Sequence, residues 1–402
     1  MIDLFLKSTK YDNNKFYLLA IYFCWLASLL MYFLFGEYIK AGALENGVKL
    51  GNDSEFYLRE TRNILSGDIS ILQYKSKFGY LLFLIPFLYF DLSLFNVVLL
   101  QIFITSIAAF CLYKITKKYF CKSSGIICFA LFLLYFPLQH RNFYILTEIL
   151  FIDISIILTF FIVFFKKHYL PIIIILLLFL ISIRPNGILY FFSISTCLFY
   201  FLINYRKYLT LGIYLILIFI ILFPVINFLN AYLQDLNLIK SLDKGIIWGY
   251  SFETGKICKS SCLNVDLINK NYPNSLLGFI QFISINFTEY LKIFFHKIFW
   301  MLLRIRPYYS DLHNLYLLIF NIAFYISFVY AFINKPKNLL SLNIINFYIL
   351  FSIILVGLTF ADWSGRFSLY ILPFIMIYSS YGILIFIKKI LDMVNQKRKD
   401  TT

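Results

Sequence analysis

Charged residues are scarce in this 402-residue chain. Asp, Glu, Lys and Arg together supply only 14% of it, against about a quarter of an average soluble domain. Hydrophobic residues make up 61% and aromatic residues 21%. This composition excludes an ordinary cytosolic enzyme, an intrinsically disordered chain and a small protein held together by disulfides.

Familiar catalytic and nucleotide-binding motifs are also absent from the sequence. The chain contains no Gly-rich phosphate loop, no Walker motif, no HExxH, no GxSxG and no internal repeat. Soluble nucleotide chemistry therefore has no visible site in this sequence.

Long apolar runs dominate what the sequence does contain. A helix that crosses about 30 Å of hydrocarbon needs about 20 apolar residues, and such runs recur along the chain. Because the runs are continuous rather than alternating, they favour helices over a β-barrel. We expect an all-α polytopic membrane protein with about ten transmembrane helices. These runs lie near residues 16–36, 93–113, 125–139, 144–165, 169–183, 187–204, 208–228, 314–333, 341–360 and 367–387.

The net charge is +16, and the distribution of the charged residues agrees with the predicted topology. With the N-terminus inside and a crossing at every run, the inside segments hold 18 of the 36 Lys and Arg residues but only four of the 20 acids. This distribution obeys the positive-inside rule, so the basic excess does not indicate nucleic-acid binding. We expect both termini in the cytoplasm, and we expect the membrane to be the cytoplasmic membrane of a bacterium.

Two further apolar stretches, 78–90 and 279–303, break the alternation if they cross. The first is short and contains Pro86, and the second has lysines interleaved with its apolar positions. Both patterns favour juxtamembrane helices on the outer face. In the alternative topology both stretches cross the membrane, which places the Lys-rich loop at 114–122 on the outer side.

The predicted spans divide the chain into three parts. Residues 1–228 form a transmembrane module whose first outer loop, 37–92, is long enough to carry a site. Residues 229–313 form a second outer loop, and 314–402 form a C-terminal transmembrane module with a basic cytoplasmic tail. Cys258 and Cys262 both lie in the second outer loop. They either form a local disulfide or remain two free thiols, and the sequence favours neither alternative.

The first outer loop carries the densest polar cluster, from residue 51 to residue 63. Asp53 or Ser54 suits the N-cap of a short helix that ends at Gly67. Asp53 has two interpretations: a helix cap, or a carboxylate that acts as general base on an acceptor hydroxyl or amine. One face of this helix is expected to hold Tyr57, Thr61, Ile64 and Leu65.

Further charged residues gather at the outer ends of the predicted spans. An ion in lipid is costly, so such groups usually line a cavity. The arginines can instead extend to lipid headgroups, and the acids can form structural salt bridges. Their common depth favours one polar cavity open to the outer leaflet. These residues are Glu148, Asp153, Arg184, Asp362 and Arg366.

In their order and spacing, several of these motifs resemble those of the GT-C glycosyltransferases. This group uses polyprenyl-phosphate-linked sugars and includes the protein O-mannosyltransferases and the lipid A aminoarabinose transferase. Two features depart from the family pattern: the proline pair around Gly79 is missing, and the acidic motif is Asp-x-Glu. The matching motifs are Asp53-Ser54-Glu55 with Tyr57 and Gly67, Lys77-Phe78-Gly79-Tyr80, Thr147-Glu148, Arg184-Pro185-Asn186-Gly187, and Arg366-Phe367 with Pro373.

The resemblance implies a GT-C-like fold and an inverting sugar transfer on the outer side, from a polyprenyl-phosphate donor to a glycan, lipid or protein acceptor. Asp53 would be the base, and Glu55 would orient the acceptor or help to hold a divalent ion. A requirement for Mg²⁺ or Mn²⁺, held by Asp53, Glu55 and Glu148, is left open. Cations stabilise the departing lipid phosphate. The implied donor-binding residues are Arg59, Arg62, Lys75, Lys77, Arg184 and Arg366, with Glu148 beside them and with Tyr57 and Tyr80 lining the sugar site.

Two other functions remain open. A polysaccharide polymerase or O-antigen-ligase-like enzyme would use the second outer loop, but it leaves the Asp53 cluster unexplained. A lipid-linked sugar flippase or transporter would be expected to show related halves, which the sequence lacks. The residues that the polymerase interpretation requires are His296, Arg304, Arg306 and His313.

Overall fold

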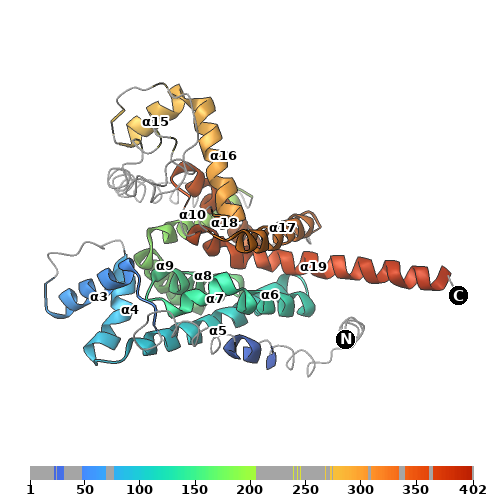
Figure 1. Ribbon diagram of the computed structural model, residues 1–402, viewed down its shortest axis with the longest axis horizontal. Coiled ribbons are helices and arrows are strands. Elements are labelled where there is room, and N and C mark those ends of the chain that lie inside the picture. The colour runs from blue at the N-terminus through green and yellow to red at the C-terminus, as the bar shows by residue number, and fades with distance from the viewer. Residues whose placement is uncertain are drawn as a thin grey trace. The chain divides into compact units, whose positions relative to one another are not determined.

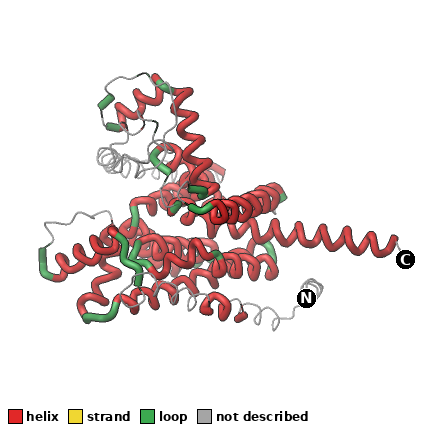
Figure 2. The backbone as a smooth tube through the Cα atoms, viewed as in Figure 1, coloured by secondary structure: helices red, strands yellow, loops and turns green. Residues whose placement is uncertain are grey.

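A computed structural model describes residues 22–23, 25–30, 48–68, 77–204, 239, 242, 245, 268, 272–273, 275–306, 309–334, 340–361 and 365–400. This part of the chain is built from helices joined by loops, as Figure 2 shows. Figure 1 labels the main helices. In chain order the elements are α3 (Asn52–Leu65), α4 (Phe78–Tyr89), α5 (Leu94–Tyr119), α6 (Lys122–Leu134), α7 (Phe136–Gln139), η2 (His140–Phe143), α8 (Thr147–Val163), η3 (Lys167–Tyr169), α9 (Leu170–Ile183), η4 (Pro185–Gly187), α10 (Ile188–Asn204), α15 (Leu276–Ile285), α16 (Phe287–Leu303), α17 (Asp311–Ile333), α18 (Leu340–Leu358) and α19 (Arg366–Asp400).

Several of these helices are suited to a membrane. Within the described residues, four are long and apolar enough to cross it, and a fifth crossing is possible if one bent pair counts as a span. The chain is therefore a helical protein with membrane-capable helices, as its composition predicts. The four are Leu94–Tyr119, Pro185–Asn204, Asp311–Ile333 and Arg366–Val394.

The span expected at 125–139 is not continuous. Helix α6 ends at Leu134, and the segment from Phe136 to Phe143 leaves it at an angle of 55°. Tyr135 between them is extended, and Pro137 lies in the first turn of α7. Proline suits a helix N-terminus and disrupts a helix interior, which explains why the chain starts a new helix here.

The remaining expected spans differ in how far the structure describes them. Those at 144–165, 169–183 and 341–360 correspond to α8, α9 and α18, which are helical but shorter than the four membrane-length helices. The run at 208–228 lies outside the described residues. The run at 16–36 is described only at residues 22–23 and 25–30, where it is helical.

The chain divides into two compact units. Unit 1 comprises residues 1–191, 323–342 and 372–402, and unit 2 comprises residues 192–322 and 343–371. Each unit thus combines segments that are far apart in sequence.

Helix α8 is the centre of the packing in unit 1. It is apolar on nearly all sides, and its side chains are buried along most of its length. A helix with this pattern must be surrounded, and α5 and α9 pack against it. Helix α3 packs against α4, and α4 packs against α9, as the ribbon in Figure 1 shows.

Helix α3 begins earlier than its sequence predicts. Its N-cap is Gly51, not Asp53 or Ser54, and the Ser54 hydroxyl accepts the Gly51 N–H at 3.0 Å. The predicted end is confirmed. Gly67 has φ +83°, and the N–H of Asp68 reaches the Asn63 carbonyl at 2.9 Å. Glycine adopts this left-handed conformation without the steric cost that a side chain adds.

In unit 2, the stretch 279–303 forms two helices, α15 and α16, so the single helix predicted there is wrong. The chain turns at Asn286, whose amide accepts the Ile268 N–H at 2.8 Å and donates to the Tyr272 hydroxyl at 3.3 Å. These bonds hold the side chain in place at the break between the two helices. An apolar core lies beside it, formed by Ile239, Leu242, Phe279, Phe282, Tyr290, Ile293 and Phe360.

Candidate functional site

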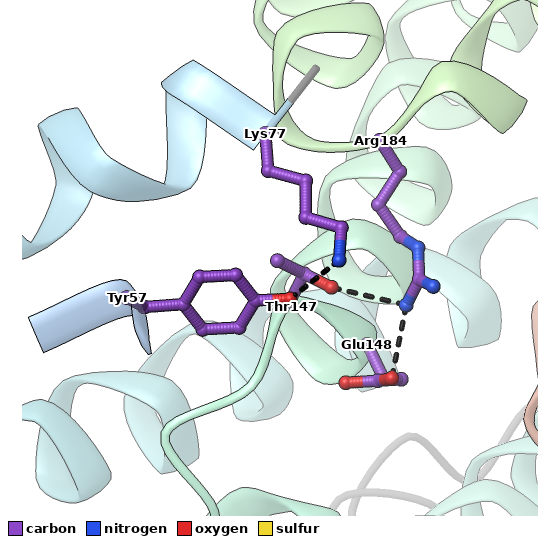
Figure 3. A network of polar contacts seen from close by, with 5 residues as sticks. All are labelled: Tyr57, Lys77, Thr147, Glu148 and Arg184. Carbon is purple, nitrogen blue, oxygen red and sulfur yellow. Dashed lines mark hydrogen bonds and ion pairs between the residues drawn. The ribbon is translucent and has the colours of Figure 1, made fainter. Parts of the chain in front are cut away.

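Polar side chains from four segments of unit 1 converge beside the first turn of α8. Figure 3 shows the charged ends of Lys77 and Arg184 directed toward one region, next to Tyr57 and Thr147. Lys77 lies directly before α4, and Arg184 directly after α9. We call Tyr57, Lys77, Tyr80, Thr147, Glu148 and Arg184 the outer cluster.

A close helix contact places the two cations. A Cβ added to Gly79 on α4 would lie 2.2 Å from the Ser182 Oγ and 2.9 Å from the Ile183 nitrogen at the end of α9. Only glycine permits this approach. Since Lys77 lies two residues before Gly79 and Arg184 follows Ile183, the contact brings the segments that carry both cations together.

Arg184 links two residues at the start of α8. Its Nη1 donates to the Thr147 hydroxyl at 3.0 Å and lies 2.9 Å from Glu148 Oε1. The Glu148 side chain is 1% exposed and the Arg184 side chain 11% exposed. Breaking such a buried pair leaves an uncompensated charge, which is strongly destabilising.

Lys77 lies against Tyr57 on α3. Its Nζ donates to the Tyr57 hydroxyl at 2.8 Å and lies 5.2 Å from the centre of the Tyr57 ring. These contacts attach α3 to the start of α4.

Tyr80 joins the two halves of the cluster. Its ring packs edge-on against Tyr57 with centroids 5.3 Å apart, and its side chain is fully buried. Among the described residues its hydroxyl has no hydrogen-bond partner. Burial raises the pKa of Tyr80 well above its ordinary value, and the nearby Tyr57 and Glu148 groups raise it further. The hydroxyl is therefore a neutral donor with a hydrogen to offer.

The two acids predicted to be catalytic lie on different faces of α3. Asp53 is half-buried and precedes Tyr57 by four residues, so both occupy the face that meets the cluster. Glu55 is exposed. The structure thus brings Asp53, but not Glu55, to the side of the helix that carries Tyr57.

The other predicted cations fall in three different settings. Arg59 and Arg62 are exposed, and the Arg59 guanidinium lies 4.5 Å from the centre of the Phe56 ring. Lys75 lies outside the described residues. Arg366 starts α19 in unit 2.

Sequence reasoning missed the buried carboxylate of Glu60. Its side chain is 1% exposed, and Arg59 Nη2 lies 3.9 Å from its Oε1. Glu60 follows Tyr57 by three residues and therefore shares the buried face. That spacing was the available signal, but the polar residues on either side made it resemble a solvated helix face.

The possible metal ligands named from the sequence do not form a metal site. In the part of the chain that the structure describes, no three His, Cys, Asp or Glu residues are grouped so that they could hold an ion. Asp53, Glu55 and Glu148 all fall within that part.

The residues of the polymerase interpretation belong to unit 2. Arg306 is fully buried, and its Nη1 donates to the carbonyls of Trp300 and Ile305 at 3.0 and 2.7 Å. His313 stacks on Tyr309 with centroids 4.4 Å apart, and His296 is exposed. Arg306 therefore supports the turn after α16, and these contacts give it a structural role.

Chemically, the outer cluster combines two cations, one carboxylate and a neutral phenol donor. Lys77 and Arg184 suit an anion with several oxygens, such as a phosphate ester, because arginine donates to two acceptors and lysine adds a point charge. Comparison of the chain with protein-family models, with curated proteins and with solved structures finds no match.

Proposed function

We propose that this protein is an integral-membrane glycosyltransferase. It moves a sugar from a polyprenyl-phosphate donor to a glycan, lipid or protein acceptor on the outer side of a bacterial cytoplasmic membrane. The observation that carries the proposal is the convergence of Lys77 and Arg184 on one region beside Tyr57, Tyr80 and the first turn of α8.

The proposed topology has ten spans, with both termini in the cytoplasm. It rests on the distribution of charge, since the segments assigned to the inside hold 18 basic residues and four acids. This topology puts every member of the outer cluster at the outer boundary of the membrane. A donor with a prenyl tail in the bilayer would present its phosphate at that depth.

The GT-C resemblance adds independent support to the same residues. Its acidic motif, its Lys77-Phe78-Gly79-Tyr80 segment, its Thr147-Glu148 pair and its Arg184 turn come from separate parts of the sequence. All four contribute to one region of unit 1. Convergence of this kind is what a shared substrate site requires.

In the proposed reaction, Asp53 takes the proton of the acceptor hydroxyl while the acceptor oxygen attacks C1 of the sugar. The bond between C1 and the phosphate oxygen breaks, and its electron pair stays on that oxygen. The departing polyprenyl phosphate therefore gains a negative charge. Lys77 and Arg184 neutralise this charge, and the Tyr80 hydroxyl can donate to a phosphate or sugar oxygen.

Turnover by the wild type and by Asp53→Asn tests this proposal. Both proteins are purified and given a panel of polyprenyl-phosphate sugars with hydroxyl and amine acceptors, and sugar release is measured. We expect the wild type to turn over one donor and Asp53→Asn to lose at least a hundredfold in kcat, because general-base catalysis contributes roughly 10²–10⁴-fold.

Asp91→Asn is the matched control, because Asp91 is an exposed carboxylate at the end of α4, away from the outer cluster. We expect it to keep wild-type turnover. Equal turnover in Asp53→Asn would show that Asp53 is not the base. Turnover of no donor by any of the three proteins would count against the transferase and favour the polymerase or transporter interpretations.

A further inference from the structure

Beneath the outer cluster, unit 1 contains a buried chain of polar side chains that the proposed reaction does not use. It runs from the bend between α6 and α7 to the middle of α8. Every member is at most 3% exposed. The members are Gln101 and Thr105 on α5, Gln139 and Asn142 at the bend, and Asp153 on α8.

The orientation of each amide in this chain is fixed by its neighbour. Gln139 Nε2 lies 2.6 Å from the Phe132 carbonyl, which only accepts, so this nitrogen is the donor. Gln139 therefore turns its Oε1 toward Asn142, whose Nδ2 donates to it at 3.2 Å. Asn142 must then present Oδ1, its acceptor, to Thr105.

The Thr105 hydroxyl has a single hydrogen but lies beside two acceptor atoms. Its Oγ1 lies 3.0 Å from Asn142 Oδ1 and 2.6 Å from Asp153 Oδ2. Both separations are those of full hydrogen bonds, and one hydroxyl hydrogen can make only one of them. Since Asn142 offers no hydrogen to Thr105, the second hydrogen must come from Asp153.

We infer that Asp153 is a proton-binding site: its carboxyl group carries a hydrogen on Oδ2 and donates it to Thr105. Thr105 in turn donates to Asn142, so that each of the two short contacts of the Thr105 hydroxyl contains one hydrogen. The other oxygen, Oδ1, is buried and has no hydrogen-bond partner among the described residues. A neutral acid tolerates such a position far better than a carboxylate does.

The scarcity of charged groups around Asp153, among the described residues, agrees with a neutral acid. Among the described residues no Lys, Arg or His lies within ion-pairing distance of it. On α5 the buried Cys111 interacts electrostatically with Asp153, and α9 carries no charged residue. Glu148 on α8 is paired with Arg184. His140 and Arg141 of η2 direct their side chains to Tyr144.

The bound proton also fixes the segment that leads into the outer cluster. Asn142 lies next to Phe143, whose carbonyl accepts the Lys49 N–H at 2.8 Å, three residues before α3 begins. Gln101 Nε2 holds the same segment through the carbonyls of Asn142 and Tyr144, at 2.7 and 3.1 Å. Asp153 therefore acts as a positioning residue for the start of α3.

Infrared difference spectroscopy of the full chain in lipid nanodiscs tests the inference directly. Protein with ¹³C-labelled aspartate carboxyl groups is compared at neutral pH with labelled Asp153→Asn. We expect the wild type minus Asp153→Asn spectrum to contain the C=O band of a protonated carboxylic acid. A pair of carboxylate bands in that difference would overturn the inference. Asp91→Asn, at an exposed aspartate, is expected to remove carboxylate bands only.

Thermal unfolding gives a second readout. The amide of Asp153→Asn can donate to Thr105 as the acid does, so this variant is expected to melt within a few degrees of the wild type. Asp153→Leu removes the donor and is expected to melt much lower. Equal destabilisation by both variants would mean that an ionised carboxylate is required. Neither readout needs a substrate, so both outcomes are independent of the proposed reaction.

Discussion

At the scale of single residues, Arg184 is a structural link at the start of α8, and the proposed function makes it a phosphate-binding group as well. Its guanidinium has five N–H groups, and the contacts to Thr147 and Glu148 both involve Nη1. Arginine suits this position better than lysine, because the planar guanidinium has several donors and can pair with Glu148 while it also contacts a ligand in the proposed function. The pair with Glu148 thereby orients the cation.

Among the described residues of unit 2, Lys297 has a charge that responds to pH in the neutral range. It is fully buried on α16, its Nζ donates to the Thr359 carbonyl just beyond α18, and the Phe360 ring lies 5.4 Å from that nitrogen. Burial lowers the pKa of Lys297 from 10.5 to about 7. In the unfolded chain the same group keeps its ordinary pKa.

We therefore expect the stability of unit 2 to rise with pH from about 7 to about 10.5. In that window the unfolded chain binds a proton that the folded chain does not, so folding is favoured as pH increases. Denaturant unfolding at several pH values, followed through tryptophan fluorescence, measures this. Lys297→Met should flatten the slope, whereas the exposed Lys292→Met should keep it. An unchanged slope in Lys297→Met would contradict the assignment.

At the scale of helices, the approach of α4 to α9 decides whether the outer cluster forms. Gly79→Ala would place a Cβ against the backbone of Ser182 and Ile183. Since backbone cannot move aside cheaply, we expect a loss of about 1–3 kcal/mol in unfolding free energy and weaker binding of any anion at Arg184. Thermal melting and ligand binding measure the two effects.

Gly51→Ala is the matched control for Gly79→Ala. Nothing lies within 4 Å of a Cβ built at Gly51, and its φ of −108° suits any residue. Because glycine is preferred to alanine at an N-cap, we expect this change to cost roughly 0.5 kcal/mol, less than Gly79→Ala. A similar loss in both variants would show that the α4–α9 contact is not what positions Arg184.

Helix positions were largely predictable from the sequence, and helix breaks were not. Apolar runs correctly placed α5, α9 and α17, and Gly67 correctly ended α3. The break at Asn286 depends on hydrogen bonds to Ile268 and Tyr272. These partners lie too far away in the sequence for a local pattern to reveal them. The bend before α7 had a local signal in Pro137, but the strong apolar run around it obscured that signal.

The candidate site was predictable as a set of residue types but not as a set of contacts. The sequence named Tyr57, Lys77 and Arg184, yet nothing in it pairs Lys77 with Tyr57, twenty residues away. It also placed Glu55 beside Asp53 in the site, as a residue that orients the acceptor or helps to hold an ion, yet the two acids face different sides of α3. Such pairings depend on how helices meet in space, and periodicity along one helix carries no information about them.

At the scale of the whole molecule, the positions of the apolar runs and the distribution of charged residues lead to the same predicted topology. The predicted inside segments hold 18 basic residues and four acids, whereas the rest of the chain holds 18 basic residues and 16 acids. In the proposed topology the outer cluster and Asp53 lie on the outer side, where a lipid-linked phosphate from the outer leaflet would arrive. Because charges of both signs nearly balance outside the inside segments, the paired cations of the outer cluster provide a local site where an anion is attracted.

The central claim is that Lys77 and Arg184 bind the phosphate of a polyprenyl lipid. Native mass spectrometry of the protein with polyprenyl phosphate and with polyprenol of equal length tests it most directly, since only the phosphate differs. We predict that the wild type prefers the phosphate by at least roughly tenfold, as expected if a charge-assisted bond contributes about 1.5 kcal/mol or more.

The preference should fall sharply in Lys77→Met and in Arg184→Met, and it should persist in Lys292→Met, where an exposed lysine of unit 2 is removed. Equal retention of polyprenyl phosphate and polyprenol by the wild type would contradict the account. An undiminished preference in both outer-cluster variants would contradict it as well.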